Sequence, residues 1–213
     1  MKKKVLAGLV GTMLVSSIGF AAPVVELNKG ETTIGYSHSN FDLTVNGDSD
    51  LGDLKANGYY VQHGLTDKIT LGFEKNKGKY SCTDGVDSNT INISFNDIYA
   101  TYKVAKNAQI LLGNRAYKLS GFGTEAGVPW SETLSTENKL MYGIQGTAKL
   151  AEKLNGYLGF IKTSEETESK IGVIYAVASN TNLDLNYTIH KWDIDDIDEL
   201  KFKGIGFGLN YKF

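Results

Sequence analysis

The last ten residues of the chain alternate strictly between apolar side chains and small or polar ones. Every second residue from Ile205 to Phe213 is apolar, and the residues between them are glycine, asparagine or lysine. Because the side chains of a strand point alternately to its two faces, this pattern predicts a β-strand with one apolar face. Such a face packs on a protein core or meets lipid, and the alternation alone permits both.

Similar segments recur along the chain and predict an all-β protein. We expect strands at about 31–39, 55–64, 69–76, 93–104, 109–118, 139–150, 155–162, 170–178, 182–190 and 201–213. The facing of the fifth segment stays open, because Ile110, Leu111 and Leu112 are consecutive. Neither of the two prolines, Pro23 and Pro129, interrupts a predicted strand, as a sheet requires.

The connections between these segments alternate in length. Those after the second, fourth, sixth and eighth strands are tight turns. The intervening connections are mostly longer and polar, at about 40–54, 77–90, 120–137, 163–169 and 191–199. Short turns on one side and long loops on the other are typical of transmembrane β-barrels, and strands near ten residues long match the length that a tilted strand needs to cross a bilayer.

The N-terminus predicts a cleaved secretory signal over residues 1–21, which leaves 22–213 as the mature barrel domain. Three lysines precede an apolar segment, and small residues at Gly19 and Ala21 suit a cut after Ala21. No later segment reaches the about 20 apolar residues of a membrane helix. A mature chain that spans a bilayer must therefore do so as a closed barrel.

Taken together, these features resemble the small bacterial outer-membrane β-barrel superfamily, which includes opacity-type and porin-family proteins. The resemblance implies a transmembrane antiparallel up-and-down barrel in the Gram-negative outer membrane. The predicted segments number ten, and eight, the commoner size of small barrels, is the alternative if the first or fifth strand fails to pair. A secreted or periplasmic β-sandwich or barrel is the competing interpretation. The resemblance further implies contact with outer-membrane lipid and lipopolysaccharide, and with the barrel-assembly machinery, which reads a C-terminal signal here formed by Phe207, Leu209, Tyr211 and Phe213.

The faces opposite the apolar ones carry polar side chains interleaved with glycines. Inside a narrow barrel, glycine makes room for long polar side chains of neighbouring strands. We therefore expect a polar network in the lumen, formed by Glu74, Asp97, Lys103, Arg115, Gln145, Asp184 and Asn186. Pairs of Glu74 or Asp97 with Lys103 or Arg115 would fill the interior if they meet.

Clustered carboxylates in the outer loops are a further candidate site. Asp193, Asp195, Asp196 and Asp198 lie in the last loop and are weak candidates for binding Ca²⁺ or Mg²⁺, which prefer oxygen ligands. They would also bias permeation toward cations. Their spacing does not match an EF-hand loop, and the plain alternative is loop charge that keeps the surface solvated.

Composition and motifs do not favour catalysis or nucleic-acid binding. The net charge of −2 gives no basic excess for a nucleic-acid partner, and no cofactor is implied. His38 is flanked by serines, and His190 stands near Asp193, a pair similar to the Asp–His pairing of omptin proteases. Omptins have strands that project beyond the membrane, and we expect a chain of about 190 residues to have no room for them.

The sequence therefore predicts a non-enzymatic outer-membrane barrel with two candidate functions. In the first, it is a porin-like channel that passes small solutes, with a preference for cations. In the second, it is a closed structural or adhesive barrel that displays acidic loops. Barrels this narrow are usually filled by side chains, which favours the second function, whereas the family resemblance favours the first. An outer-membrane hydrolase is a remote third.

Overall fold

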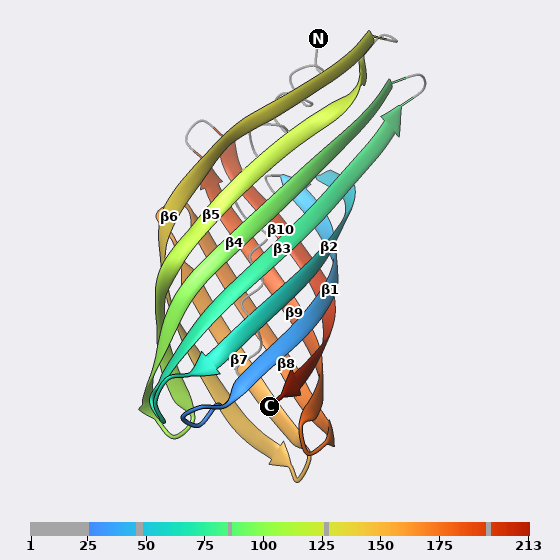
Figure 1. Ribbon diagram of the computed structural model, residues 1–213. Coiled ribbons are helices and arrows are strands. Elements are labelled where there is room, and N and C mark those ends of the chain that lie inside the picture. The colour runs from blue at the N-terminus through green and yellow to red at the C-terminus, as the bar shows by residue number, and fades with distance from the viewer. Residues whose placement is uncertain (1–25, 46–48, 85–86, 126–127, 195–196) are drawn as a thin grey trace.

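The computed structural model describes residues 26–45, 49–84, 87–125, 128–194 and 197–213, and they form one closed barrel of ten antiparallel strands (Figure 1). Each strand pairs with its neighbours in chain order, and β1 pairs with β10 to close the sheet. The strands are β1 Thr32–Val45, β2 Ser49–Gly64, β3 Ile69–Asp84, β4 Asp87–Ala105, β5 Ala108–Glu125, β6 Val128–Ala151, β7 Leu154–Lys162, β8 Glu166–Ala178, β9 Thr181–Ile194 and β10 Ile197–Lys212.

The prediction of a ten-stranded barrel is confirmed, and the eight-stranded alternative is wrong. A barrel of eight strands required that the first or the fifth strand fail to pair, but β1 and β5 are each paired with a strand on both sides. The predicted signal peptide lies outside the described residues and stays a prediction. No helix in the described part of the chain is long and apolar enough to span a membrane.

In the half of the barrel that includes the C-terminus, the apolar faces of the strands point outward and the polar faces point into the barrel. On β10, Ile205, Phe207 and Leu209 are exposed, whereas Gly206 and Asn210 are buried. The ambiguous segment of β5 resolves in the same way, because Leu111 is buried and its neighbours Ile110 and Leu112 are exposed. The result is a belt of exposed apolar side chains around the barrel, the reverse of a water-soluble protein.

The turns at one end are tight. Lys106–Asn107 and Glu152–Lys153 form two-residue turns as predicted, and the turn between β8 and β9 falls at Ser179–Asn180, one residue earlier than expected. The C-terminus lies at this end, where the Phe213 amide donates a 2.8 Å hydrogen bond to the Thr32 carbonyl. In a transmembrane barrel, the end with short turns is the periplasmic end.

The strands are much longer than the sequence predicted at the opposite, outer end. Most of the expected long loops are strand: β5 runs to Glu125 and β6 starts at Val128, so the predicted loop 120–137 is a hairpin. The predicted loops 40–54, 77–90 and 191–199 are shortened in the same way. The expectation that this chain has no room for strands that project beyond the membrane is therefore wrong.

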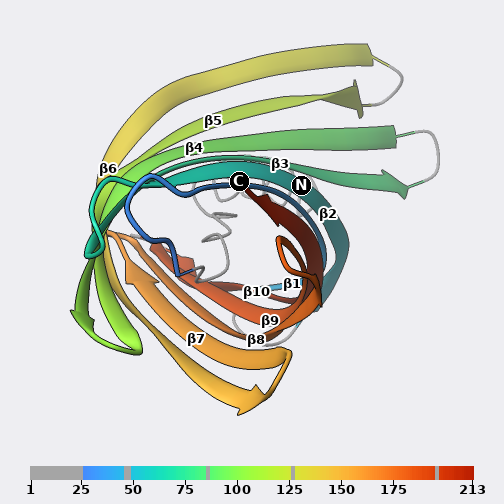
Figure 2. The ribbon, with the colours of Figure 1, turned by 60° about the horizontal axis from the view of Figure 1, so that its bottom comes forward.

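Strands β3, β4, β5 and β6 project furthest and form a four-stranded sheet beyond the barrel wall (Figures 1 and 2). Pairing between β2 and β3 ends at Leu54↔Tyr80, while β3 and β4 stay paired out to Asp84↔Asp87. On the other side, β6 pairs with β7 only from Tyr142 onward. Within the described chain, residues Val128–Met141 of β6 therefore pair with β5 alone.

Candidate functional site

The centre of the barrel is occupied by an ion cluster around Arg115. This residue on β5 lies directly opposite Asp97 on β4. Its guanidinium donates two hydrogen bonds to the carboxylate, from Nε to Oδ1 at 3.0 Å and from Nη2 to Oδ2 at 2.8 Å. Its Nη1 donates to Glu166 Oε2 at 3.0 Å, and its Nη2 lies 3.4 Å from Glu168 Oε2. Because both glutamates come from β8, these contacts join distant strands across the interior.

Two further side chains complete this cluster. The Tyr117 hydroxyl donates a short hydrogen bond to Glu166 Oε1. His190 on β9 places Nε2 3.5 Å from Glu166 Oε2 and Nδ1 4.0 Å from Glu168 Oε2. All members are buried. A buried charge is tolerated when it is paired and hydrogen-bonded, and here one guanidinium holds three carboxylates in a fixed arrangement.

An apolar layer covers this cluster on the outer side. Phe95 packs edge-on against Tyr117, with ring centroids 5.5 Å apart, and Phe202 contacts His190 in the same manner. The layer is completed by the buried side chains of Phe41, Leu43, Leu54, Ile91 and Ile93. These side chains lie toward the outer end of the barrel from the ion cluster, so apolar groups fill the interior on that side.

A second polar layer fills the barrel on the periplasmic side of the ion cluster. Asp184 accepts hydrogen bonds from the Tyr157 hydroxyl at 2.8 Å and the Asn186 amide at 2.7 Å. Glu74 accepts one from Asn76 at 2.9 Å. Large side chains in this layer lie over glycines of adjacent strands: a Cβ atom at Gly35 would sit 2.1 Å from Tyr60 Cζ. At this position the glycine leaves space for the large side chain of the neighbouring strand, as the sequence predicts for interior glycines.

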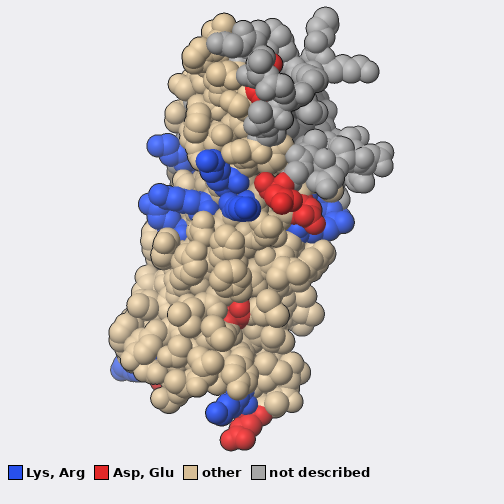
Figure 3. Space-filling model, turned by 90° about the vertical axis from the view of Figure 1, so that its right-hand side faces the viewer, with Lys and Arg blue, Asp and Glu red and all other residues tan. Residues whose placement is uncertain are grey.

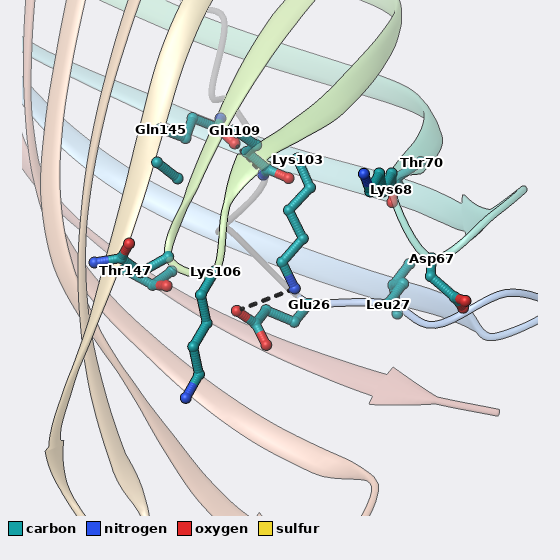
Figure 4. A pocket seen from close by; sticks show the side chains of 12 residues that line it. Glu26, Leu27, Asp67, Lys68, Thr70, Lys103, Lys106, Gln109, Gln145 and Thr147 are labelled. Carbon is teal, nitrogen blue, oxygen red and sulfur yellow. Dashed lines mark hydrogen bonds and ion pairs between the residues drawn. The ribbon is translucent and has the colours of Figure 1, made fainter.

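The periplasmic opening is narrowed by the segment that precedes β1 (Figure 4). Leu27 is buried there, and the Lys29 amide donates to Asp67 Oδ1 at 3.0 Å. Glu26 lies 3.7 Å from Lys103 Nζ. The pocket between this segment and the turns encloses about 30 Å³, which is room for only one or two water molecules.

Glu31 anchors this N-terminal segment. Its carboxylate accepts a 2.7 Å hydrogen bond from the Asn28 amide and lies 3.1 Å from Lys212 Nζ. The backbone hydrogen bond from Asn28 is the largest cause of a pKa of Glu31 below its ordinary value of 4.5. Burial opposes this effect, and the contact with Lys212 lowers the pKa further. Glu31 is therefore ionised at neutral pH.

The predicted lumen residues do not form a single network. Asp97 and Arg115 meet in the ion cluster, and Glu74 on β3 lies directly opposite Asp97. Asp184 and Asn186 are hydrogen-bonded to each other in the second polar layer. Gln145 is nearer the periplasmic opening, where its Oε1 accepts a 2.8 Å hydrogen bond from Gln109. Lys103 departs from the prediction: it lies at the opening beside Glu26 and touches neither Glu74 nor Asp97 within the described contacts.

Sequence reasoning missed Glu166 and Glu168, which it assigned to a surface loop. The period-two pattern of β8 was the available signal: Ile171 and Tyr175 point outward, so Lys170, Glu168 and Glu166 fall on the inward face. The side chains of Asp193, Asp195, Asp196 and Asp198 lie outside the described residues. No cluster of metal-ligating side chains occurs in the part of the chain that is described.

The described histidines do not form the arrangement of a hydrolase. His38 Nδ1 lies 2.8 Å from Asn57 Oδ1 and its ring contacts Phe207, while His63 Nδ1 lies 2.9 Å from Thr32 Oγ1. Neither has a carboxylate partner in its recorded contacts. His190 has two, but it is buried beneath the apolar layer. A catalytic base needs access to its substrate.

This chain is similar in structure to several solved proteins. The attachment invasion locus protein Ail of Yersinia pestis, in complex with the heparin analogue sucrose octasulfate, is 11% identical, with a TM-score of 0.52, over 87% of this chain and 99% of that chain. The translocator domain of the autotransporter NalP from Neisseria meningitidis is 12% identical, with a TM-score of 0.50, over 100% of this chain and 95% of that chain. The outer-membrane protease OmpT from Escherichia coli is 10% identical, with a TM-score of 0.48, over 86% of this chain and 96% of that chain.

No protein-family model matches the sequence, and no curated protein matches it either. The structural likenesses are far below the identity at which function is shared, so they show the fold alone. The chain therefore has the fold of the small outer-membrane β-barrels, as the resemblance in its sequence implied.

Proposed function

We propose that this protein is a non-enzymatic outer-membrane barrel that is closed to solutes and acts through the surface it presents outside the cell. The observation that carries the proposal is the filled interior. Arg115 joins β4, β5 and β8 across the lumen, an apolar layer covers it on the outer side, and the N-terminal segment narrows the periplasmic opening.

The belt of outward apolar side chains supports an outer-membrane location. In water, this much exposed apolar surface drives association, whereas in lipid it is the favourable arrangement. The closed sheet also leaves no unpaired strand edge at the depth of the belt, as a bilayer requires. Contact with the barrel-assembly machinery through Phe207, Leu209, Tyr211 and Phe213 belongs to the same proposal.

The projecting β3–β6 sheet supports an adhesive or display function. It extends beyond the barrel wall, and its outer strand β6 has a long row of backbone groups without a neighbouring strand within the described chain. Such an edge is a template for pairing with another extended chain. A protein named for attachment and invasion shares the fold, which agrees with a function at the cell surface.

Single-channel recording of the refolded protein in a planar bilayer tests the proposal. We expect no steady openings from protein that shows heat-modifiable gel mobility, the mark of a folded barrel. Steady openings would contradict the closed barrel and favour the porin-like function that the sequence also predicts. In that case, the variant with Asp193, Asp195, Asp196 and Asp198 changed to Asn tests whether the outer carboxylates select cations.

A further inference from the structure

The outer part of strand β6 is a sheet edge that the barrel leaves uncovered. Residues 128–141 pair with β5 on one side and, within the described chain, with no strand on the other. In Figure 2 this strand forms the margin of the four-stranded sheet that extends beyond the barrel wall. Alternate residues of an edge strand direct their backbone N–H and C=O groups away from the sheet, so this edge is available to pair with a second extended chain.

The outer end of this sheet is acidic and carries no basic residue. Segments 80–84, 87–90, 119–125 and 128–138, which form the outer ends of β3 to β6, contain no Lys or Arg. On the face that Figure 3 shows, Lys and Arg side chains lie in a band at mid-height, with carboxylates beside them, and at the lower end, but not above the band among the residues drawn in colour. The same four segments contain the acidic residues Asp84, Asp87, Glu125, Glu132 and Glu137, of which the last two belong to the edge strand.

Trp130 holds an oriented aromatic ring beside this edge. It lies on β6 directly opposite Gly123, and its indole Nε1 donates a 3.2 Å hydrogen bond to Asn89 Oδ1 on β4. The ring therefore reaches across β5, where a Cβ atom at Gly121 would be 2.9 Å from its Cη2 atom. The side chain is half-buried on the surface of the sheet. The face of a Trp ring attracts the cationic group of lysine and, more often, of arginine.

Charge decides which extended chain fits this edge. A second copy of this protein would place one edge strand that carries Glu132 and Glu137 beside another, and like charges on neighbouring strands are destabilising. A strand rich in Lys or Arg places opposite charges there instead, and it supplies a cation for the ring of Trp130. We infer that the β6 edge binds an extended, basic polypeptide segment by strand addition, and this inference rests on the proposed function at the cell surface.

Peptide binding to the folded protein in vesicles of uncharged lipid tests the inference. The probe is a peptide of about ten residues that alternates Lys with Thr, and it is compared with Glu–Thr and Gln–Thr peptides of the same length. We expect the Lys–Thr peptide to bind, to slow hydrogen exchange of the amides in residues 128–141, and to bind more tightly than the other two. A Lys–Thr peptide that is methylated at every second backbone nitrogen cannot pair with the edge and should bind at least about 10-fold more weakly.

Variants of the protein separate the charge from the aromatic ring. Glu132→Gln/Glu137→Gln should weaken binding of the Lys–Thr peptide about 10-fold, because each cross-strand pair of opposite charges contributes roughly a factor of three. Trp130→Leu keeps an apolar side chain over the glycines without an aromatic face and should weaken binding about threefold. The matched control Asp42→Asn/Asp53→Asn removes two exposed carboxylates that lie opposite each other on β1 and β2, and it should leave binding unchanged.

Several outcomes would overturn the inference. Equal binding of the Glu–Thr peptide, equal loss in the control variant, or equal binding of the methylated peptide would each do so. Exchange protection of β6 that grows with protein density in the absence of peptide would show that a second copy occupies the edge. If the Gln–Thr peptide binds as tightly as the Lys–Thr peptide and protects β6, the preference for a basic partner is refuted while the proposed function stands. Steady single-channel openings would instead contradict the closed barrel and leave the result on β6 unaffected.

Discussion

Gly72 on β3 and Tyr99 on β4 lie opposite each other, and the tyrosine ring occupies the space that a side chain at position 72 would need. A Cβ atom there would lie 2.3 Å from Tyr99 Cζ. The ring is buried, and its hydroxyl accepts a 2.9 Å hydrogen bond from the Gln62 amide. Moving the ring aside would break that hydrogen bond inside the barrel, so the interior has little freedom to adapt.

Replacing Gly72 with Ala should therefore destabilise the barrel. We expect the free energy of unfolding to fall by about 1–3 kcal/mol, the usual effect of overpacking a filled interior. The measurement is urea unfolding in lipid vesicles, followed by gel mobility. Gly159→Ala is the matched control, because a Cβ at that inward glycine would meet Gln145 Cγ at 3.6 Å, an ordinary contact. Equal destabilisation by the two variants would contradict the prediction.

The ion cluster makes a second prediction. Arg115→Met leaves three buried carboxylates without their guanidinium partner, and we expect a loss of about 3–5 kcal/mol in the free energy of unfolding. Adding Asp97→Leu to this variant removes one of the buried carboxylates that lost its guanidinium partner. The double variant should be more stable than the sum of the two single changes predicts, as measured by urea unfolding in vesicles.

Arg115→Lys serves as the control that separates charge from geometry. Lysine keeps the positive charge, but its single ammonium group cannot donate two hydrogen bonds to Asp97 and a further one to Glu166 in the geometry of the guanidinium. We expect a stability between those of the unmodified protein and Arg115→Met. If the free energy of unfolding of Arg115→Lys is as low as that of Arg115→Met, the several hydrogen bonds of the guanidinium, rather than its charge, stabilise the cluster.

Acid should loosen the N-terminal segment. The folded-state pKa of Glu31 is lowered, so the stabilisation that it gives is present above its unfolded pKa of about 4.5 and is lost as the pH falls through the folded value. Hydrogen exchange of the Asn28 amide, which Glu31 holds, should therefore become faster in acid beyond the ordinary pH trend. Glu31→Gln should remove this extra pH dependence, and its persistence in that variant would contradict the assignment.

The sequence identified the strands within the membrane but not their extensions, and β4 shows why. From Ile98 to Val104, the apolar residues point outward to the belt, whereas Ile91, Ile93 and Phe95 are buried inside. The apolar pattern therefore shifts by one residue where the strand leaves the belt, because water replaces lipid outside and the interior becomes the apolar side. The shift breaks the alternation on each face, and the predicted strand 93–104 accordingly leaves out residues 87–92 at the outer end of β4.

The same reasoning explains how much of the interior could be predicted. Asp97 was identified as a candidate because it lies on the polar face of a clear strand, and Arg115 because it is a charged residue within a predicted strand whose facing stayed open. The register of β4 and β5 brings the two together. Glu166 and Glu168 lie at the start of β8, among other charged residues that resemble a loop. Which strands face each other across the lumen depends on how the barrel closes, and the alternation of a single strand does not contain that information.

The facing of β5 gives a last prediction about the membrane itself. Leu112 is exposed in the apolar belt, with 59% of its surface accessible, while the adjacent Leu111 is 3% accessible and lies against Tyr99 and Met141 inside. Arginine at an outward position is opposed by lipid most strongly at the bilayer midplane and much less near the headgroups. Leu112→Arg should therefore reduce the free energy of unfolding in vesicles by about 2–4 kcal/mol. Asn92→Arg, an outward position on β4 that lies beyond the belt, opposite Lys79 on β3, should reduce it by about 1 kcal/mol or less. In detergent, where the apolar layer adapts to the protein, the difference between the two variants should shrink. If both variants are equally stable in vesicles, Leu112 does not face lipid, and the apolar belt around this barrel is not a membrane-spanning surface.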